Sequence, residues 1–89
     1  MSTERVLEIL LYERPGCGLC HEMLTVVEGL QPEFSLDVRR VDISADPGLE
    51  AEYGTQIPVL FIAGRKAFKY RVTSGALRAR LLQALRARA

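Results

Sequence analysis

The spacing of apolar residues in the first part of the chain predicts a strand followed by a helix. The run V-L-E-I-L-L-Y at positions 6–12 carries a single charge, which is typical of a strand buried on most of both faces. The sequence E-R-P-G at 13–16 predicts a loop, because Pro and Gly interrupt regular structure. From Cys17 onward, apolar residues recur at three- and four-residue spacing, which predicts an amphipathic helix ending near Gly29 and Pro32. The apolar positions of this helix are Leu19, Met23, Val26, Val27 and Leu30.

The middle of the chain predicts a second strand and a second, shorter helix. Apolar and polar residues alternate early in positions 34–42, and the alternation breaks at Arg39 and Arg40. We therefore expect a strand over 34–42 with one end facing solvent. Residues 44–53 begin with residues that favour a helix N-terminus and are followed by Gly54, so they predict a short helix.

The last third predicts a hairpin and a final helix. Positions 59–62 form a compact apolar strand, 63–65 resemble a hairpin turn, and 66–72 alternate as a polar edge strand. Thr73 and Ser74 can cap the helix that follows. The apolar positions of that helix are Leu77, Leu81, Leu82 and Leu85.

The resulting order of elements is β-α-β-α-β-β-α, which belongs to the α/β class. The first half forms a right-handed parallel β-α-β unit, and the second half ends in a hairpin and a helix. We expect one domain over residues 1–89, built on a four-stranded mixed sheet flanked by helices on both faces.

Composition and charge exclude several classes of protein. The 89 residues are 48% hydrophobic and have a formal net charge of +1, so the chain is neither disordered by composition nor a dedicated nucleic-acid binder. No apolar run approaches the roughly 20 residues of a membrane span, and the first five residues do not form a basic signal-peptide start. Two cysteines are too few for a disulfide-dense secreted scaffold. We expect a cytoplasmic monomer that binds neither nucleic acid nor membrane.

The candidate chemistry lies in Cys17-Gly18-Leu19-Cys20, at the start of the first predicted helix. The thiolate, not the thiol, attacks disulfides, and the free N–H groups and dipole of a helix N-terminus favour negative charge. Cys20, three residues on, lies close enough to close a small disulfide or to resolve a mixed one. We therefore predict Cys17 as the nucleophile and Cys20 as the buried resolving thiol. Gly18 would allow a partner to approach the backbone closely.

Other uses of a C-x-x-C motif are less well supported. A structural zinc site needs two further ligands, and the chain contains one histidine, His21, and no third cysteine. An inert cysteine pair and an iron–sulfur cluster bridged between two chains are the remaining alternatives. Redox chemistry is the favoured interpretation, with no metal.

These features together resemble the thioredoxin fold and, within it, the glutaredoxins. The strand, loop and C-x-x-C helix resemble the first half of that fold. Residues 56–64 resemble the glutaredoxin stretch that reads threonine-valine-proline and continues as an apolar strand ending near a glycine. The resemblance implies a cis bond between Ile57 and Pro58, with Pro58 facing the cysteines and the Ile57 backbone binding an extended substrate. It also implies that Arg14 supports the thiolate and the carboxylate of glutathione.

The sequence also departs from that pattern. A typical glutaredoxin has proline and tyrosine inside its motif where this chain has Gly18 and Leu19, and the segment 70–75 lacks the usual glycine pair and acidic residue. In a glutaredoxin those residues hold the γ-glutamyl end of glutathione, and here Thr73 and Ser74 would have to do so. The absence of a tryptophan before the motif and of a proline inside it argues against thioredoxin itself. The chain therefore resembles the divergent small glutaredoxin-like proteins of bacteria.

Two functional hypotheses follow. The first is a thiol–disulfide oxidoreductase that forms a mixed disulfide on Cys17. It would act on disulfide-containing proteins or small thiols, with glutathione or a thioredoxin-type protein as reductant and no cofactor beyond glutathione as a co-substrate. The alternative is a redox-inactive thioredoxin-fold binding module without standard glutathione recognition.

Overall fold

The computed structural model describes residues 6–88, and its elements follow the predicted order. Two strands and two helices make up the first half, with a short 3-10 turn, η1, between β2 and α2. The bounds are β1 (Leu7–Glu13), α1 (Gly18–Gly29), β2 (Leu36–Asp42), η1 (Ile43–Ala45), α2 (Pro47–Tyr53), β3 (Val59–Ile62), β4 (Arg65–Lys69) and α3 (Ser74–Arg88). The expectation that the first five residues do not form a signal-peptide start concerns residues outside the described range.

The four strands form one mixed sheet in the order β2-β1-β3-β4. β1 pairs in parallel with β2 and antiparallel with β3, and β4 closes an antiparallel hairpin on β3. A parallel pair needs a crossover connection, and α1 provides it. This arrangement confirms the predicted α/β class and the mixed four-stranded sheet.

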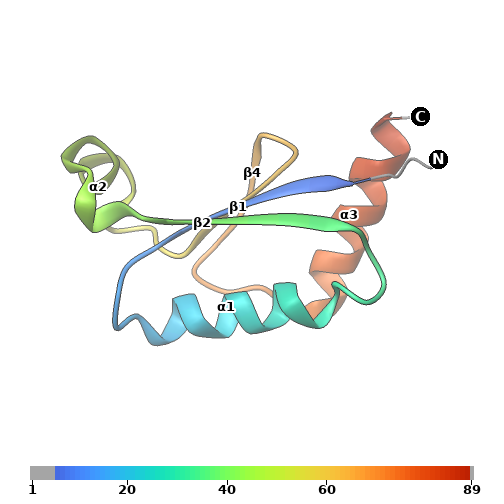
Figure 1. The fold of residues 1–89 in the computed structure, drawn as a ribbon, viewed down its shortest axis with the longest axis horizontal. Helices are drawn as coiled ribbons and strands as arrows, with labels where there is room; N and C mark the ends of the chain where they lie inside the picture. The colour runs from blue at the N-terminus through green and yellow to red at the C-terminus, as the bar shows by residue number, and fades with distance from the viewer. Residues whose placement is uncertain (1–5, 89) are drawn as a thin grey trace.

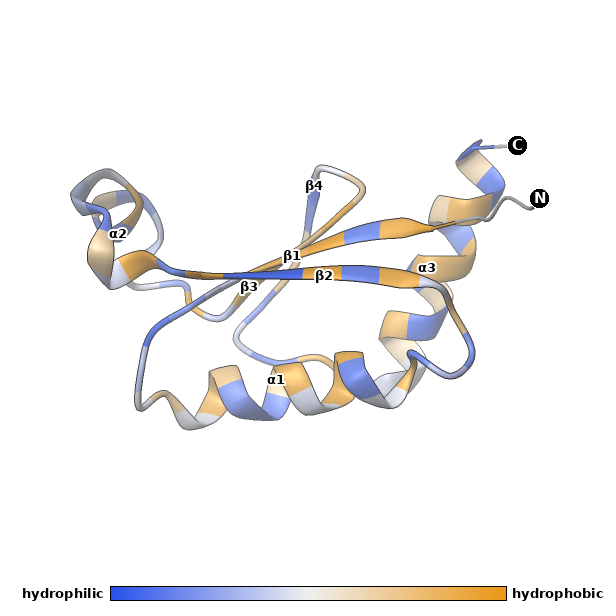
Figure 2. Ribbon diagram, in the orientation of Figure 1, coloured by the Kyte–Doolittle hydropathy of each residue, from blue (hydrophilic) through white to orange (hydrophobic). Residues whose placement is uncertain are grey.

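Helices α1 and α3 lie on one face of the sheet and enclose the hydrophobic core (Figure 1). On β1 every second side chain points into this core, because successive side chains of a strand alternate between faces. In Figure 2, apolar and polar bands alternate along α1, whereas β1 is mostly apolar. The most buried residues of this cluster are Leu7, Ile9, Leu11, Met23, Val27, Leu60, Leu77 and Leu81.

Among residues 6–88, a helix covers the opposite face of the sheet at one end only. Tyr53 of α2 packs on Tyr12 of β1 and Phe61 of β3, with ring centroids 5.0 and 6.0 Å from it. The rings of Tyr12 and Phe61 are also in edge contact, 5.2 Å apart. Figure 1 shows α2 beyond the end of the sheet, away from α3. Helices therefore contact both faces, as predicted, but they cover them very unequally.

Several boundaries differ from the predicted ones. β1 extends through Glu13, which the sequence analysis placed in a loop. β2 begins at Leu36, and Phe34 is buried instead in the turn that follows α1. Ile43 of η1 is fully buried, a core position that strand and helix periodicity did not reveal because η1 has too few residues to show a period.

The largest departure is in β4, which ends at Lys69 instead of reaching Val72. The pairing with β3 shifts by one residue, so that Ala67 has no partner and forms a β-bulge. Ala67 and Phe68 consequently both pack against the core, although they are adjacent in sequence. Tyr70 then adopts a φ of 70°, which takes the chain out of the strand.

The hairpin turn between β3 and β4 lies where the sequence predicts it. Ala63 and Gly64 have φ values of 51° and 81°. A two-residue turn with positive φ at both positions matches the right-handed twist of the strands. Gly64 adopts this conformation without strain, whereas the Cβ of Ala63 makes it unfavourable by about 1 kcal/mol. None of the helices within residues 6–88 has the length and apolar character needed to cross a membrane.

Candidate functional site

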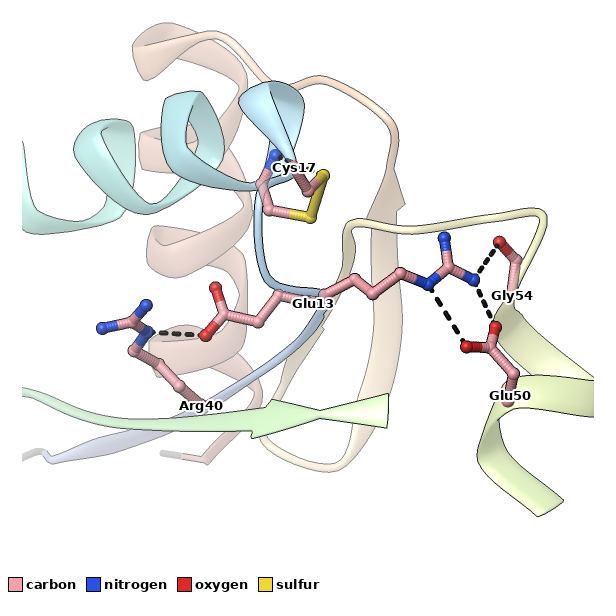
Figure 3. The surroundings of a disulfide bond; sticks show 7 residues. Glu13, Cys17, Arg40, Glu50 and Gly54 are labelled. Carbon is pink, nitrogen blue, oxygen red and sulfur yellow. Dashed lines mark hydrogen bonds and ion pairs between the residues drawn. A yellow bond between two sulfur atoms is a disulfide. The ribbon is translucent and has the colours of Figure 1, made fainter. Parts of the chain in front are cut away.

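The two cysteines lie at the first turn of α1 and are joined as a disulfide (Figure 3). Their Cα atoms are 5.2 Å apart, which lies within the usual range for a disulfide. Cys20 is 2% exposed and belongs to the buried set, whereas Cys17 is only half-buried. Of the two cysteines, Cys17 is therefore the more exposed residue.

Cys17 is the N-cap residue of α1, and its side chain fills the role that a serine or aspartate usually has. Its extended backbone (φ −96°, ψ 110°) places the sulfur over the first turn, where the N–H of Cys20 donates to Cys17 Sγ at 3.1 Å. The first turn of α1 contains no acidic residue. The positive end of the helix dipole therefore acts on this sulfur without competition from a neighbouring carboxylate in that turn.

Gly16 sets the direction in which the chain enters α1. Its φ of 72° is left-handed, a conformation that glycine adopts at little cost. A Cβ at this position would meet no atom within 4 Å, so the requirement is one of backbone conformation and not of space.

A cavity of about 630 Å³, which we call the cysteine cavity, lies beside the disulfide. Its lining includes both cysteines, the loop before them, and the ends of β1 and β2. Glu13 lies there with its side chain 14% exposed and accepts a hydrogen bond from Arg40 Nε at 2.8 Å (Figure 3). The charged or titratable residues of the lining are Glu13, Arg14, His21, Arg40 and Asp42.

Glu13 and Arg40 belong to the site, although neither was predicted as a site residue. The core-facing series of β1 runs Leu7, Ile9, Leu11 and continues to Glu13, and Arg40 is the register partner of Leu11 on β2. The two-residue period of β1 therefore places Glu13 on the core face, but this follows only if the strand extends through Glu13. Under the cysteines the core face of the sheet changes from apolar to charged.

Arg14 lines the cysteine cavity, but its guanidinium is directed to α2. It forms hydrogen bonds and an ion pair with Glu50, and Arg14 Nη2 donates to the carbonyl oxygen of Gly54 at 3.1 Å (Figure 3). The hydrogen bond to Glu50 raises the pKa of Arg14 above its ordinary value. The structure thus places Arg14 in the lining of the cysteine cavity, with its charge paired to a carboxylate of α2. Its support of the thiolate and of glutathione stays a prediction.

Two of the other predicted residues, Gly18 and Thr73, lie on two different surfaces. Gly18 lines the cysteine cavity. Thr73 lines a second hollow, of about 480 Å³, which we call the apolar groove. It lies between α1 and the segment joining β4 to α3, and it includes Leu19 from between the cysteines. Thr73 also caps α3 as predicted, since its Oγ1 accepts from the N–H of Ala76 at 3.1 Å.

Ile57, Pro58 and Ser74 lie outside the linings of these two hollows. The Ile57–Pro58 peptide bond is cis, and Pro58 is buried. The carbonyl oxygen of Pro58 accepts from the N–H of Tyr70 at 2.8 Å, which links the Pro58 segment to the wall of the apolar groove. Within residues 6–88, no three His, Cys, Asp or Glu side chains are grouped so that they could hold a metal ion.

The chain is similar to a family of glutaredoxin-like sequences and to proteins from several bacteria. The model of the family described as "Glutaredoxin-like domain (DUF836)" matches residues 8–82. The uncharacterized proteins Rv0508 of Mycobacterium tuberculosis and Mb0520 of Mycobacterium bovis are each 30% identical over 77 residues, covering 81% of this chain and 79% of the relative.

Solved structures show the same fold. Protein Ne2328 from Nitrosomonas europaea has a TM-score of 0.74 at 25% identity, covering 89% of this chain and 95% of its own. Target protein XcR50 from X. campestris has a TM-score of 0.68 at 33% identity, with coverage of 84% and 96%. A mutant thioredoxin from Halobacterium salinarum, 22% identical, has a TM-score of 0.60 and covers 82% of this chain and 69% of its own.

The family match spans the sheet, the cysteine pair and most of α3, and the thioredoxin structure shares the arrangement of the strands. The disulfide at the start of α1 fits a redox role. This chain therefore belongs to the glutaredoxin-like domain family (DUF836) and has a thioredoxin-like fold.

Proposed function

We propose that this protein is a thiol–disulfide oxidoreductase in which Cys17 is the nucleophile and Cys20 the resolving thiol. The observation that carries the proposal is the asymmetry of the pair. Cys17 is half-buried at a helix N-terminus and accepts an N–H hydrogen bond on its sulfur, while Cys20 is 2% exposed. An accessible, electrostatically favoured sulfur next to an inaccessible one supports a division of roles.

The proposed reduction proceeds in two exchange steps. In the dithiol form, the Cys17 thiolate attacks one sulfur of a substrate disulfide. A bond forms between Cys17 and that sulfur, and the other substrate sulfur leaves as a thiolate and takes a proton. Cys20 then loses its proton and attacks the Cys17 sulfur, which releases the second substrate sulfur. Two electrons pass to the substrate, and the Cys17–Cys20 disulfide is formed.

An external thiol completes the cycle. Two molecules of a small thiol such as glutathione, or one dithiol protein of the thioredoxin type, reduce the Cys17–Cys20 disulfide by the reverse exchange and become oxidised themselves. We propose disulfide-containing polypeptides or small disulfides as substrates, a monomeric protein, and the cytoplasm as its compartment. No metal takes part in these steps.

Turnover of a disulfide substrate by three proteins tests this proposal: the wild type, Cys17→Ser and Cys20→Ser. Each is supplied either with glutathione and its reductase or with a thioredoxin system. We expect turnover by the wild type with at least one reductant and none by Cys17→Ser. Reduced Cys20→Ser, mixed with the substrate in the absence of an external thiol, should accumulate a mixed disulfide that is visible by mass spectrometry. If the folded wild type turns over nothing with either system, the binding-module hypothesis replaces this one.

A further inference from the structure

Tyr70 holds an unusual backbone conformation beside the apolar groove. Its φ of 70° lies in the left-handed region that an aromatic side chain seldom adopts. The N–H of Arg71 donates to the carbonyl oxygen of Lys69 at 2.8 Å, so Tyr70 is the central residue of a γ-turn in its rare positive-φ form. Strained backbone of this kind persists only where surrounding contacts hold it, and it concentrates at functional sites.

The contacts that hold Tyr70 lead to the segment before β3. Its N–H donates to the carbonyl oxygen of Pro58 at 2.8 Å, and its hydroxyl donates to the carbonyl oxygen of Thr55 at 2.9 Å. Tyr70 as a whole is 42% exposed and lines the apolar groove. The protein therefore fixes both the backbone and the phenol of a side chain whose ring remains accessible to an incoming molecule.

A second irregularity places another aromatic ring on the same groove. The β-bulge at Ala67 shifts the register of β4, and Phe68 lines the groove as a result. Bulges next to active sites commonly redirect a side chain in this way. Two departures from regular strand geometry within four residues thus both bring an aromatic ring to one hollow, which also includes Leu19 from between the cysteines.

The lining of the groove is mostly apolar, which favours an apolar occupant. Its charged lining residues, Glu22 and Arg71, lie 3.6 Å apart as an ion pair. Two further cations lie against its aromatic rings: Lys69 Nζ is 5.5 Å from the centroid of Tyr70, and Arg80 Cζ is 5.8 Å from that of Phe68. Leu19, Met23, Val26 and Val72 complete an apolar surface that is continuous with the cysteine turn.

We propose that Tyr70 is a specificity-determining residue that selects polypeptide disulfides in which an apolar side chain flanks the reacting cysteine. The flanking side chain lies in the apolar groove against the Tyr70 ring while the substrate sulfur meets Cys17. This inference rests on the proposed oxidoreductase function and names its class of substrate.

Two peptides of equal length and charge test it, each linked through its cysteine to a chromophoric thiol and each with either Leu or Ser beside that cysteine. We expect the wild type to show a kcat/KM for the Leu peptide about tenfold above that for the Ser peptide, mainly through KM. Tyr70→Phe keeps the ring and should keep the preference. Tyr70→Gly relieves the backbone strain but removes the ring, and the ratio should fall to about one.

The exposed side chain of Leu82 provides a matched control, since it is 41% exposed on α3 and lies outside the groove lining. Leu82→Ala should retain the tenfold ratio. If Tyr70→Gly does not fold, Tyr70→Asn replaces it, because asparagine tolerates positive φ. The proposal is overturned if the wild type has no preference, or if the ring-less variant keeps it.

A binding measurement separates failure of this inference from failure of the proposed function. Dye-labelled versions of both peptides, with serine replacing the reacting cysteine, are titrated with wild type and Tyr70→Gly by fluorescence anisotropy. If the wild type binds the Leu peptide more tightly than the Ser peptide and Tyr70→Gly does not, the result supports binding of the apolar side chain in the groove. It does so even if no disulfide is turned over. Turnover of both disulfide peptides with equal efficiency supports the oxidoreductase and refutes the selection by Tyr70.

Discussion

Gly54 connects α2 to the loop before the cysteines, and replacing it with alanine should disrupt that connection. Its N–H donates to the carbonyl oxygen of Glu50 at 2.9 Å, and its own carbonyl oxygen accepts from Arg14 at 3.1 Å. A Cβ on Gly54 would lie 2.5 Å from the backbone oxygen of Glu50 and would also collide with the Glu50 carboxylate. The carboxylate can rotate away, but the backbone oxygen cannot move without breaking the last hydrogen bond of α2.

The expected loss of stability depends on which atom the new methyl group would displace. Forcing a methyl group into filled space typically costs about 1–3 kcal/mol, and a backbone neighbour places Gly54→Ala near the middle of that range, at about 2 kcal/mol. For a chain of 89 residues this lowers the melting temperature by about 10 °C. The Arg14 contact to Gly54 is lost or lengthened in the same step.

Gly29→Ala is the matched control, because it adds the same methyl group at the end of α1 where no atom lies within 4 Å of the new Cβ. Alanine is the better helix former, so Gly29→Ala should be stabilising by about 0.5 kcal/mol. Urea unfolding of both variants, followed by circular dichroism, measures the two changes in free energy. The reasoning fails if both substitutions change stability by the same amount, or if Gly54→Ala leaves it within about 0.5 kcal/mol of the wild type.

Three further predictions address the core, the hairpin and the dependence of stability on pH. Leu81→Ala should lower the free energy of unfolding in urea by about 3 kcal/mol, because Leu81 is 0% exposed. Leu82→Ala should lower it by no more than about 0.5 kcal/mol, because Leu82 is 41% exposed. Equal losses of stability in the two variants would contradict the burial of Leu81. Ala63→Asn should raise stability by about 0.5–1 kcal/mol in the same assay, because asparagine tolerates the φ of 51° better than alanine, and a lower melting temperature would count against this account of the turn. The hydrogen bond from Arg78 lowers the pKa of Glu33 below its ordinary value of 4.5, so this pair stabilises the fold above pH 4.5 and the contribution is lost as pH falls through the lowered pKa. The stability difference between wild type and Glu33→Gln should therefore shrink from pH 7 to pH 3, and a difference that stays constant would exclude this linkage.

The sequence by itself was sufficient for the order of elements and for the position of the reactive pair. Apolar periodicity separated the strands from the helices, because each element must bury one side against the sheet or the core. The C-x-x-C spacing at a loop–helix junction placed Cys17 at the start of α1, and Thr73 and Ser74 marked the N-terminus of α3. These features depend on neighbours within a few residues, which the sequence displays directly.

Only the tertiary structure decided what Arg14, Glu13 and Tyr70 contact. Arg14 binds Glu50, 36 positions away in the chain, and Glu13 binds Arg40 across the parallel pair. The burial of Leu81 but not Leu82 on α3 depended likewise on how the helix sits against β1 and α1. One unpaired residue in β4 redirected Phe68, and a turn at Tyr70 ended the strand early. Local periodicity cannot anticipate such features, because a single inserted residue exchanges the two faces of a strand, and long-range partners are chosen by the packing of the whole fold.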